Sequence, residues 1–558
     1  MTIDYTSVTP GPVPDDATTY DVRMRDGIRL ATDHYSVAQN TVLAPTILIR
    51  LPYDKNGEYT FIADIARYMV QRGYHVVAQD VRGKFRSEGE SLLFVNEVYD
   101  GYDTIEWITQ QPWSDGTVAM WGDSYYGYTQ WAAVSSRHPA LKAIAPRVTG
   151  TGLGELPVAA PGANTSDVEM SIILMYPLTH FHSADTYEWE PDWSTRPYID
   201  DLESFQRQVG ARSPSFDLWY PQPVVLRRFP NGSPFDAPAV PVLNTIGWWD
   251  NCAPWSWRDH AEIQKRPAWA HNEYLMIESI DHENNRFELP LDNSPQQRAE
   301  MLPRYLDPAL EFFDVFVRGL APASSIPKVR WNLANTAGIR ESASWPPPNT
   351  KILDLYLDAD SLLSSVPDSL ARTADWVHDP DNLVPSTAEN PFAFLEELPD
   401  ERALAARADV LVFTSPIRDA ALYLVGAVSL EANVSSTGPA TDVFARLYDL
   451  SSDGKQTRIA RGQVRILDTT DSTPISIDMG QLGYALDVGH ALRLHVCSSD
   501  FPEFIPQPGT DESPWTATTV ATTTQSLELG GARGARLIVH TVDAADLPPT
   551  TSTKAQQK

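Results

Sequence analysis

The sequence predicts an α/β protein in which a parallel sheet covered by helices is followed by a domain of β-strands. Over residues 1–150, and again over 239–326, apolar strands alternate with amphipathic helices, which is the pattern of such a sheet. The alternation stops over 151–238, where aromatic residues, prolines and acids surround helical segments, so we expect a helical insertion there. From 327 to 547, short β-type runs separated by Gly, Pro, Asp and Ser indicate a β-sandwich. The remaining 548–558 are poor in hydrophobic residues and predicted to be disordered.

The composition and charge of the chain indicate which kinds of molecule we do not expect it to bind. The chain of 558 residues has a formal net charge of −30, whereas nucleic acids and anionic membranes attract clustered Lys and Arg, so we expect neither as a partner. Cys252 and Cys497 form no C-x-x-C motif, so no metal site, disulfide framework or cofactor is predicted. The first residues lack the basic and apolar stretches of a signal peptide, and no apolar run has membrane-spanning length, so a cytoplasmic location is expected. The oligomeric state stays open, a homodimer included.

The expected elements of the α/β part follow one another closely along the chain. Alternating polar and apolar residues around Asp26-Gly27 predict a hairpin. Continuous apolar runs predict buried strands, and apolar residues at helical spacing predict the helices between them. In chain order these are the hairpin over 19–35, a strand over 46–49, a helix over 61–70, a strand over 74–78, a helix over 102–110, a strand over 117–120, a helix over 129–137, strands over 143–145, 240–246 and 274–277, and a helix over 306–318.

Ser124 lies between a predicted strand and a predicted helix, with Gly122 and Gly127 on either side. This layout is typical of a nucleophile elbow, a tight turn that exposes a reactive serine at the edge of a sheet. The usual pattern is G-x-S-x-G, and here the second glycine comes one place late. On this stretch alone, an ordinary glycine-flanked serine at a strand–helix junction therefore stays an alternative.

A serine hydroxyl becomes nucleophilic only when a base accepts its proton, and the base must be oriented by a third group. In an α/β-hydrolase sheet the acid and then the histidine follow the serine along the chain, each after a strand. Asp250 follows the strand predicted over 240–246, and His282 follows the strand predicted over 274–277. The predicted triad is therefore Ser124, Asp250 and His282, with His282 as the base.

Other histidines offer weaker alternatives. Asp259 and His260 are neighbours on a predicted helix, where adjacent side chains point about 100° apart, and His271 precedes a strand instead of following it. The tetrahedral intermediate also needs donors for its oxyanion. The N–H of Tyr125 is one candidate, and the hydroxyl of Tyr53, in a loop after a predicted strand, is a second. On the sequence alone, Tyr53 is equally explained as a residue that packs its loop.

Taken together, these motifs resemble the cocaine esterase-like (CocE/NonD) serine hydrolases, which include the Xaa-Pro dipeptidyl-peptidases of the S15 type and the α-amino acid ester hydrolases. The resemblance implies an α/β-hydrolase core over 1–150 and 239–326, a helical cap over 151–238 and a jelly-roll domain over 327–547. It also implies the triad named above and an oxyanion hole formed by the Tyr53 hydroxyl and the Tyr125 N–H. The matching segments are Pro52-Tyr53-Asp54-Lys55, Gln79-Asp80-Val81-Arg82-Gly83, Ser87-Glu88-Gly89-Glu90, Asp100-Gly101-Tyr102-Asp103, Gly122 to Gly127, Gly247-Trp248-Trp249-Asp250, Phe312-Phe313-Asp314, Phe413-Thr414-Ser415-Pro416, Thr441-Asp442-Val443 and Ser498-Ser499-Asp500-Phe501-Pro502.

The chain departs from the family pattern in a few places. The family's base usually sits in Gly-Pro-Trp-x-His, whereas here the segment is Ser279-Ile280-Asp281-His282, and an acid, Asp123, precedes the nucleophile. The amino-ester branch binds its substrate's ammonium with acids two and three places after the triad aspartate. Here these positions hold Cys252 and Ala253, which argues against that branch.

We therefore expect a serine hydrolase of carboxylic esters that acts through an acyl-enzyme on a small-molecule substrate. The same machinery would suit an amidase, an Xaa-Pro-type peptidase or an acyltransferase, and a catalytically inactive binding protein is a further alternative. Aromatic side chains near the insertion and near Asp250 suit an apolar acyl group, although they equally suit a cap core. These candidate substrate-binding residues are Trp248, Trp249, Trp189 and Phe181.

Overall fold

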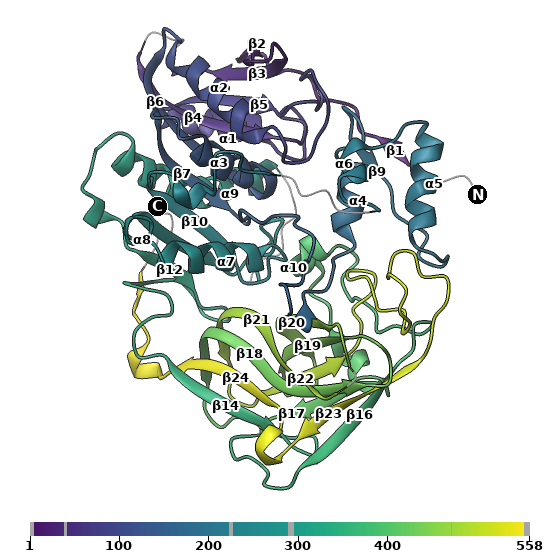
Figure 1. The fold of residues 1–558 in the computed structure, drawn as a ribbon. Coiled ribbons are helices and arrows are strands. Elements are labelled where there is room, and N and C mark those ends of the chain that lie inside the picture. The colour runs from purple at the N-terminus through teal and green to yellow at the C-terminus, as the bar shows by residue number, and fades with distance from the viewer. Residues whose placement is uncertain (1–4, 38–41, 222–226, 288–294, 470, 552–558) are drawn as a thin grey trace.

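Helices cover both faces of an 11-stranded mixed sheet in the computed structural model (Figure 1), which describes residues 5–37, 42–221, 227–287, 295–469 and 471–551. Seven adjacent strands, from β5 to β12 in the sheet order, run parallel, and the flanking strands are antiparallel. In sheet order the strands are β2 (Ala17–Arg23), β3 (Arg29–Tyr35), β5 (His75–Asp80), β4 (Ala44–Leu51), β6 (Ser114–Asp123), β7 (Leu141–Arg147), β10 (Val242–Gly247), β11 (Glu273–Glu278), β12 (Val329–Asn332), β13 (Ile339–Ser342) and β25 (Thr550–Thr551).

The strands alternate their side chains between two helical layers, because successive residues of a strand point to opposite faces. Trp121 of β6 packs in the layer of α1 (Ile62–Gln71) and α9 (Pro295–Phe316). Met120 faces the other layer. That second layer contains α2 (Glu97–Thr109), α3 (Ser124–Ser136), α7 (Ala253–Gln264) and α8 (Pro267–Asn272). The elbow helix α3 thus packs against the sheet within this second layer, which fixes the position of its first residue.

The segment between β7 and β10 contains short helices joined by irregular chain and lies beside the sheet in Figure 1. Its apolar residues Leu174, Leu202 and Phe205 form one core with Tyr125 and Tyr128 of α3. The segment therefore packs directly on the elbow helix. Its elements are β8 (Thr165–Ser166), α4 (Ile172–Thr179), β9 (Tyr187–Glu188), α5 (Ile199–Val209), α6 (Pro214–Asp217) and η2 (Pro234–Asp236); β9 pairs with β1 (Thr6–Ser7).

The last third of the chain forms two antiparallel sheets that enclose an apolar core, in agreement with the predicted β-sandwich. One sheet contains β15 (Leu363–Ser364), β14 (Lys351–Leu357), β24 (Arg536–Val542), β18 (Leu422–Ser436), β23 (Thr523–Leu529) and β16 (Arg372–His378), and β21 (Thr473–Leu486) pairs with β18. The other contains β17 (Leu411–Thr414), β22 (Ala491–Cys497), β19 (Thr441–Leu450), β20 (Gln456–Ile466) and β8 from the insertion.

Three short strands extend the first sheet beyond the boundaries that we expected. β12 and β13 lie after residue 326, yet they join the sheet of the α/β part. Thr550–Thr551 lie in the stretch predicted to be disordered, and they pair with β13; residues 552–558 are outside the described residues. Between β16 and β17, η4 (Pro391–Ala393) and α10 (Phe394–Glu397) lie between the sandwich and the α/β part in Figure 1. Among the described helices, none combines the length and the apolar character needed to cross a membrane.

Candidate active site

Ser124 is the first residue of α3, directly after β6, and its φ of 49° lies in the left-handed region. Such a φ is unfavourable for a serine, and strained backbone of this kind is found at functional turns. A Cβ on Gly122 would fall 2.1 Å from Tyr126, and a Cβ on Gly127 would fall 2.5 Å from Thr149. The second glycine is therefore required one place late, where α3 passes the segment after β7.

The structure brings Ser124, Asp250 and His282 together at the carboxyl ends of β6, β10 and β11. The Nδ1 atom of His282 lies 2.8 Å from Oδ1 of Asp250, and its Nε2 atom lies 2.9 Å from Oγ of Ser124. Asp250 Oδ1 also accepts the N–H of Cys252 at 2.9 Å, which fixes the carboxylate. The two distances are those of ordinary hydrogen bonds, so the three side chains form one continuous relay.

The electrostatic surroundings of His282 favour its protonated form. Burial alone would lower the pKa of His282, but the Cys252 thiol and the hydrogen-bonded Asp250 carboxylate raise it well above the ordinary value of 6.5. Burial raises the pKa of the Cys252 thiol, so we attribute the shift of His282 mainly to the charge of Asp250. A base with this arrangement can take a proton from Ser124 and hold it beside a fixed negative charge.

The alternative histidines do not reach the serine in this structure. His260 Nδ1 lies 2.9 Å from Oε2 of Glu273, at the start of β11, and Asp259 accepts both the N–H and the hydroxyl of Thr151. The carbonyl of His271 accepts the ammonium of Lys328. The side chains of His260 and Asp259 therefore have structural partners of their own, and His271 lies in α8, before β11.

Tyr53 and Tyr125 both lie next to the serine. Burial raises the pKa of the Tyr53 phenol, and a hydrogen bond with Tyr176, the charge of His282 and a hydrogen bond with Ser124 oppose that rise. Tyr125 is the second residue of α3, and the first N–H groups of a helix have no carbonyl partner within the helix. Its hydroxyl donates to Glu97, the first residue of α2, at 2.9 Å. A phenol O–H and a free backbone N–H are thus available beside Ser124.

Both oxygen atoms of the Asp123 carboxylate contact buried polar or charged groups. Its Oδ1 lies 3.1 Å from Nε of Arg147, and its Oδ2 accepts the Asn284 amide at 2.8 Å and the Tyr305 hydroxyl. Since Asn284 follows His282 by two residues, this buried network also ties the histidine loop to the elbow. The Asp281 carboxylate accepts the N–H of Leu395 at 2.8 Å and so ties the histidine loop to α10.

Three of the aromatic residues predicted to bind substrate are packed in cores. Phe181 is fully buried, with its ring 5.3 Å from that of Tyr125, and Trp189 is 8% exposed and stacks on Phe205. Trp248 packs against Trp345, and its indole donates to the carbonyl of Asn332 in β12. These three side chains therefore belong to apolar cores, as in the alternative that the sequence also allowed.

Trp249 is half-buried and belongs to the contact between the two parts of the chain. Its ring stacks on Phe287 at 4.6 Å, and its indole N–H donates to the carbonyl of Arg458 in β20 at 2.9 Å. In the structure Trp249 therefore lies at the junction with the sandwich.

The residues that do surround the relay come from distant segments, and the sequence reasoning missed them. Tyr176 and His180 of the insertion lie against Tyr53, with 2.9 Å between the two tyrosine hydroxyls and 5.9 Å between the rings of Tyr53 and His180. Phe392 of the β-rich part lies 5.0 Å from the ring of His282. The helical spacing of an aromatic such as Tyr176 could have marked it as cap core, but no local signal marks its hydroxyl as part of a site.

Asp250, Cys252 and His282 also have donor atoms within 4.8 Å of one another, a spacing that could hold a metal ion. Hydrogen bonds already account for this cluster, because His282 uses one ring nitrogen for Asp250 and the other for Ser124. No metal role is needed to explain it.

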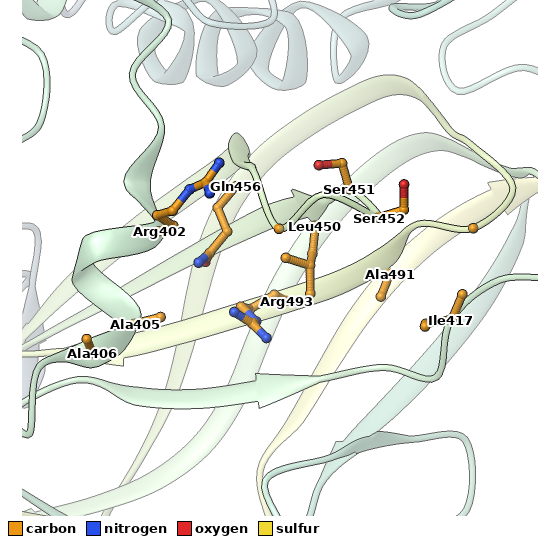
Figure 2. A pocket seen from close by; sticks show the side chains of 12 residues that line it. Arg402, Ala405, Ala406, Ile417, Leu450, Ser451, Ser452, Gln456, Ala491 and Arg493 are labelled. Atoms are coloured by element: carbon orange, nitrogen blue, oxygen red, sulfur yellow. The ribbon is translucent and has the colours of Figure 1, made fainter.

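A cavity of about 630 Å³ lies in the β-rich part, away from Ser124. Figure 2 shows Arg402, Gln456 and Arg493 along its wall, on η5 (Glu401–Ala406), β20 and β22. Its Ser451 hydroxyl bonds to Asp453, and none of the residues that line it within the described chain is a histidine. The cavity therefore offers no second nucleophile–base pair.

Comparison with known proteins agrees with this geometry. Residues 26–284 match the X-Pro dipeptidyl-peptidase (S15 family), and residues 323–538 match the X-Pro dipeptidyl-peptidase C-terminal non-catalytic domain. The chain is 29% identical to a cocaine esterase of Rhodococcus sp. (strain MB1 Bresler) over 531 residues, which cover 87% of this chain and 90% of that protein.

Two solved structures share the fold over nearly the whole chain. An α-amino acid ester hydrolase superimposes with a TM-score of 0.79 at 20% identity, covering 97% of both chains. An aminopeptidase from a marine sediment Thaumarchaeota archaeon gives a TM-score of 0.77 at 21% identity, covering 96% of this chain and 99% of that one. At these identities the structural similarity establishes the fold alone. The family follows from the two regions of the sequence that match the X-Pro dipeptidyl-peptidase domains. The chain thus belongs to the CocE/NonD and S15-type family of serine hydrolases and esterases.

Proposed function

We propose that this enzyme hydrolyses carboxylic esters of small molecules through an acyl-enzyme on Ser124. The observation that carries the proposal is the relay from Asp250 through His282 to Ser124, with hydrogen bonds of 2.8 Å and 2.9 Å. The cocaine esterase similarity supports an ester as the substrate.

In the first half-reaction, Oγ of Ser124 attacks the ester carbonyl carbon while Nε2 of His282 takes the serine proton. The carbonyl oxygen becomes an oxyanion, which the Tyr53 hydroxyl and the Tyr125 N–H would stabilise. The intermediate then collapses, the C–O bond to the alcohol breaks, and His282 gives its proton to the departing alkoxide. Water repeats the sequence on the acyl-enzyme, so that the acid is released and Ser124 regains its proton.

The acyl group is proposed to be uncharged near the reacting carbon. The positions that would hold a substrate ammonium in the amino-ester branch are Cys252 and Ala253, and burial raises the pKa of the Cys252 thiol, so this side chain supplies no negative charge at neutral pH. An ammonium buried without a counter-charge is costly. Amide hydrolysis and acyl transfer to an acceptor other than water would use the same relay and are alternatives at this site.

Active-site labelling tests the proposal and separates it from a non-catalytic binding role. A fluorophosphonate probe should modify the intact protein on Ser124, as located by peptide mass spectrometry. Ser124→Ala should remove the label and lower the turnover of a p-nitrophenyl ester by about a millionfold, the loss seen when such triads lose the nucleophile. A labelled residue other than Ser124, or a tenth of the activity in the variant, would refute the assignment. Circular dichroism and the melting temperature check that the variant is folded.

A further inference from the structure

The hydroxyl of Tyr53 is paired with a second tyrosine hydroxyl, that of Tyr176 on α4 of the insertion. The two oxygen atoms lie 2.9 Å apart, and both side chains are half-buried. Tyr176 is held in place by its ring, which stacks on His180 with 4.5 Å between ring centres and 23° between ring planes. The oxyanion donor that we propose in the loop after β4 thus has a fixed partner from another part of the chain.

Of the two hydroxyls, that of Tyr53 is the one next to the reacting groups. Ser124 and His282 both influence the pKa of Tyr53, whereas the groups that act most strongly on Tyr176 are Tyr53 itself and more distant tyrosines. Among the described residues, the Tyr176 hydroxyl forms its hydrogen bond with Tyr53, so we expect its effect on the reaction to pass through Tyr53.

The distance between the two oxygen atoms fits either hydroxyl as the donor, and the role proposed for Tyr53 sets the direction. Burial raises the pKa of both phenols, so each keeps its proton near neutral pH. One bond between two hydroxyls uses one of the two protons. If Tyr53 were the donor in this bond, its proton would be unavailable to the oxyanion. With Tyr176 as donor, the Tyr53 proton is free to point toward the carbonyl oxygen.

We propose that Tyr176 is a positioning residue for the ester hydrolysis, because its hydroxyl donates to Oη of Tyr53 and thereby directs and strengthens the Tyr53 O–H as an oxyanion donor. Hydrogen bonds in a chain polarise one another, so a phenol that accepts a bond is a better donor. This inference rests on the proposed function of Tyr53. With Tyr176 in this role, the strength of the oxyanion hole depends on the position of α4 in the insertion.

Tyr176→Phe tests this role, since it removes the hydroxyl and keeps the ring that stacks on His180. We expect kcat to fall about tenfold, which is less than the roughly hundredfold to thousandfold loss of a whole oxyanion donor, with KM changed less than twofold. The affinity for a boronic acid, which forms a tetrahedral adduct on the serine oxygen, should fall by the same factor as kcat. A purely structural defect would not produce this match.

Tyr59→Phe is the matched control. The Tyr59 ring also packs edge-on against Tyr53, at 5.9 Å, but its hydroxyl donates to Glu283 at 2.8 Å, and the side chain is largely exposed. Removing this hydroxyl should leave kcat within twofold of the wild type. An equal loss in Tyr59→Phe and Tyr176→Phe would overturn the proposal, because it would mean that any hydroxyl near Tyr53 matters.

A double-mutant cycle decides whether Tyr176 acts through Tyr53. In the Tyr53→Phe background, Tyr176→Phe should have no further effect on kcat, because the donor that it supports is already gone. A further tenfold loss in that background, or a neutral Tyr176→Phe in the wild type, would overturn the coupling while leaving Tyr53 as the donor. If Tyr53→Phe is itself fully active while Ser124→Ala is inactive, the oxyanion assignment fails, and the coupling fails with it.

Discussion

Two histidine–carboxylate pairs lie at opposite ends of strand β11, and their geometry is nearly the same. His282 Nδ1 is 2.8 Å from Asp250, beyond the carboxyl end of the strand, and His260 Nδ1 is 2.9 Å from Glu273, the first residue of the strand. The second ring nitrogen of His282 meets the Ser124 hydroxyl, whereas the carboxylate of Glu273 is shared between His260 and the Gln264 amide.

The difference indicates that the position of an acid–base pair, and not its own geometry, decides whether it can take part in catalysis. In a parallel sheet, the loops that follow the strands all meet at the carboxyl edge, which is where ligands bind. Tyr53 follows β4, Ser124 follows β6, Asp250 follows β10 and His282 follows β11. His260 lies at the other edge, where the pair links α7 to the start of β11.

Exchanging either histidine for alanine should therefore have very different effects. We expect His282→Ala to lower kcat by nearly as much as Ser124→Ala, about a millionfold, and the double variant to lose little more, because a triad acts as a unit. His260→Ala should stay within a few-fold of wild type, with a lower melting temperature as its main effect. Steady-state kinetics on a p-nitrophenyl ester measure both. If His260 were essential and His282 dispensable, the comparison would be reversed and the strand order behind it would be wrong.

A smaller loss of activity should follow when the Tyr53 hydroxyl, at the carboxyl edge of the sheet, is removed. Tyr53→Phe removes the hydroxyl beside Ser124 and should lower kcat about a hundredfold to a thousandfold with little change in KM, as expected for an interaction made in the transition state. A change in KM alone would mean that Tyr53 only lines the pocket. Ester turnover and KM, measured together with fluorophosphonate labelling of the intact nucleophile, distinguish the two results.

The pH profile should report the carboxylate beside His282. The base must be neutral to accept the serine proton, so kcat/KM falls as the pH drops through the pKa of His282, by roughly tenfold for each unit below it. Because Asp250 raises the pKa of His282, the midpoint of this acidic limb should lie above 6.5. Asp250→Asn removes that charge and should move the midpoint to lower pH while also lowering the plateau. An unshifted midpoint in Asp250→Asn would contradict the role of Asp250.

The smallest expected effect concerns the neighbours of Asp250. With Cys252 and Ala253 in place of acids, a phenylacetyl ester should have a kcat/KM several-fold higher than the matching phenylglycyl ester, whose ammonium has no counter-charge there. Glu283 is an acid near Tyr53 that could take over this role. A preference for the phenylglycyl ester that disappears in Glu283→Gln would show that it does, and would overturn the proposed acyl preference.

The parts of the site that follow from the sequence are those set by chain order. Ser124, Asp250 and His282 each follow an apolar strand, and the carboxyl ends of parallel strands must meet, so their proximity could be predicted without knowing the packing. Tyr176 and Phe392 could not be found in this way, because they reach the site from the insertion and from the β-rich part. The role of Phe181 stays a prediction for a related reason: an aromatic residue that lines a pocket and one in the core beneath it have the same pattern along the chain.

The contact of Phe392 with His282 has a consequence for the order of events during synthesis. Phe392 and Leu395 reach the histidine loop from a domain whose sheet includes β24 at Arg536–Val542. A growing chain carries all three triad residues once residue 282 has been added, yet the wall beside the histidine depends on strands that are made nearly last. We expect ribosome-bound chains that end after α9 to be inactive on esters, so that the nascent enzyme cannot act until its translation is almost finished.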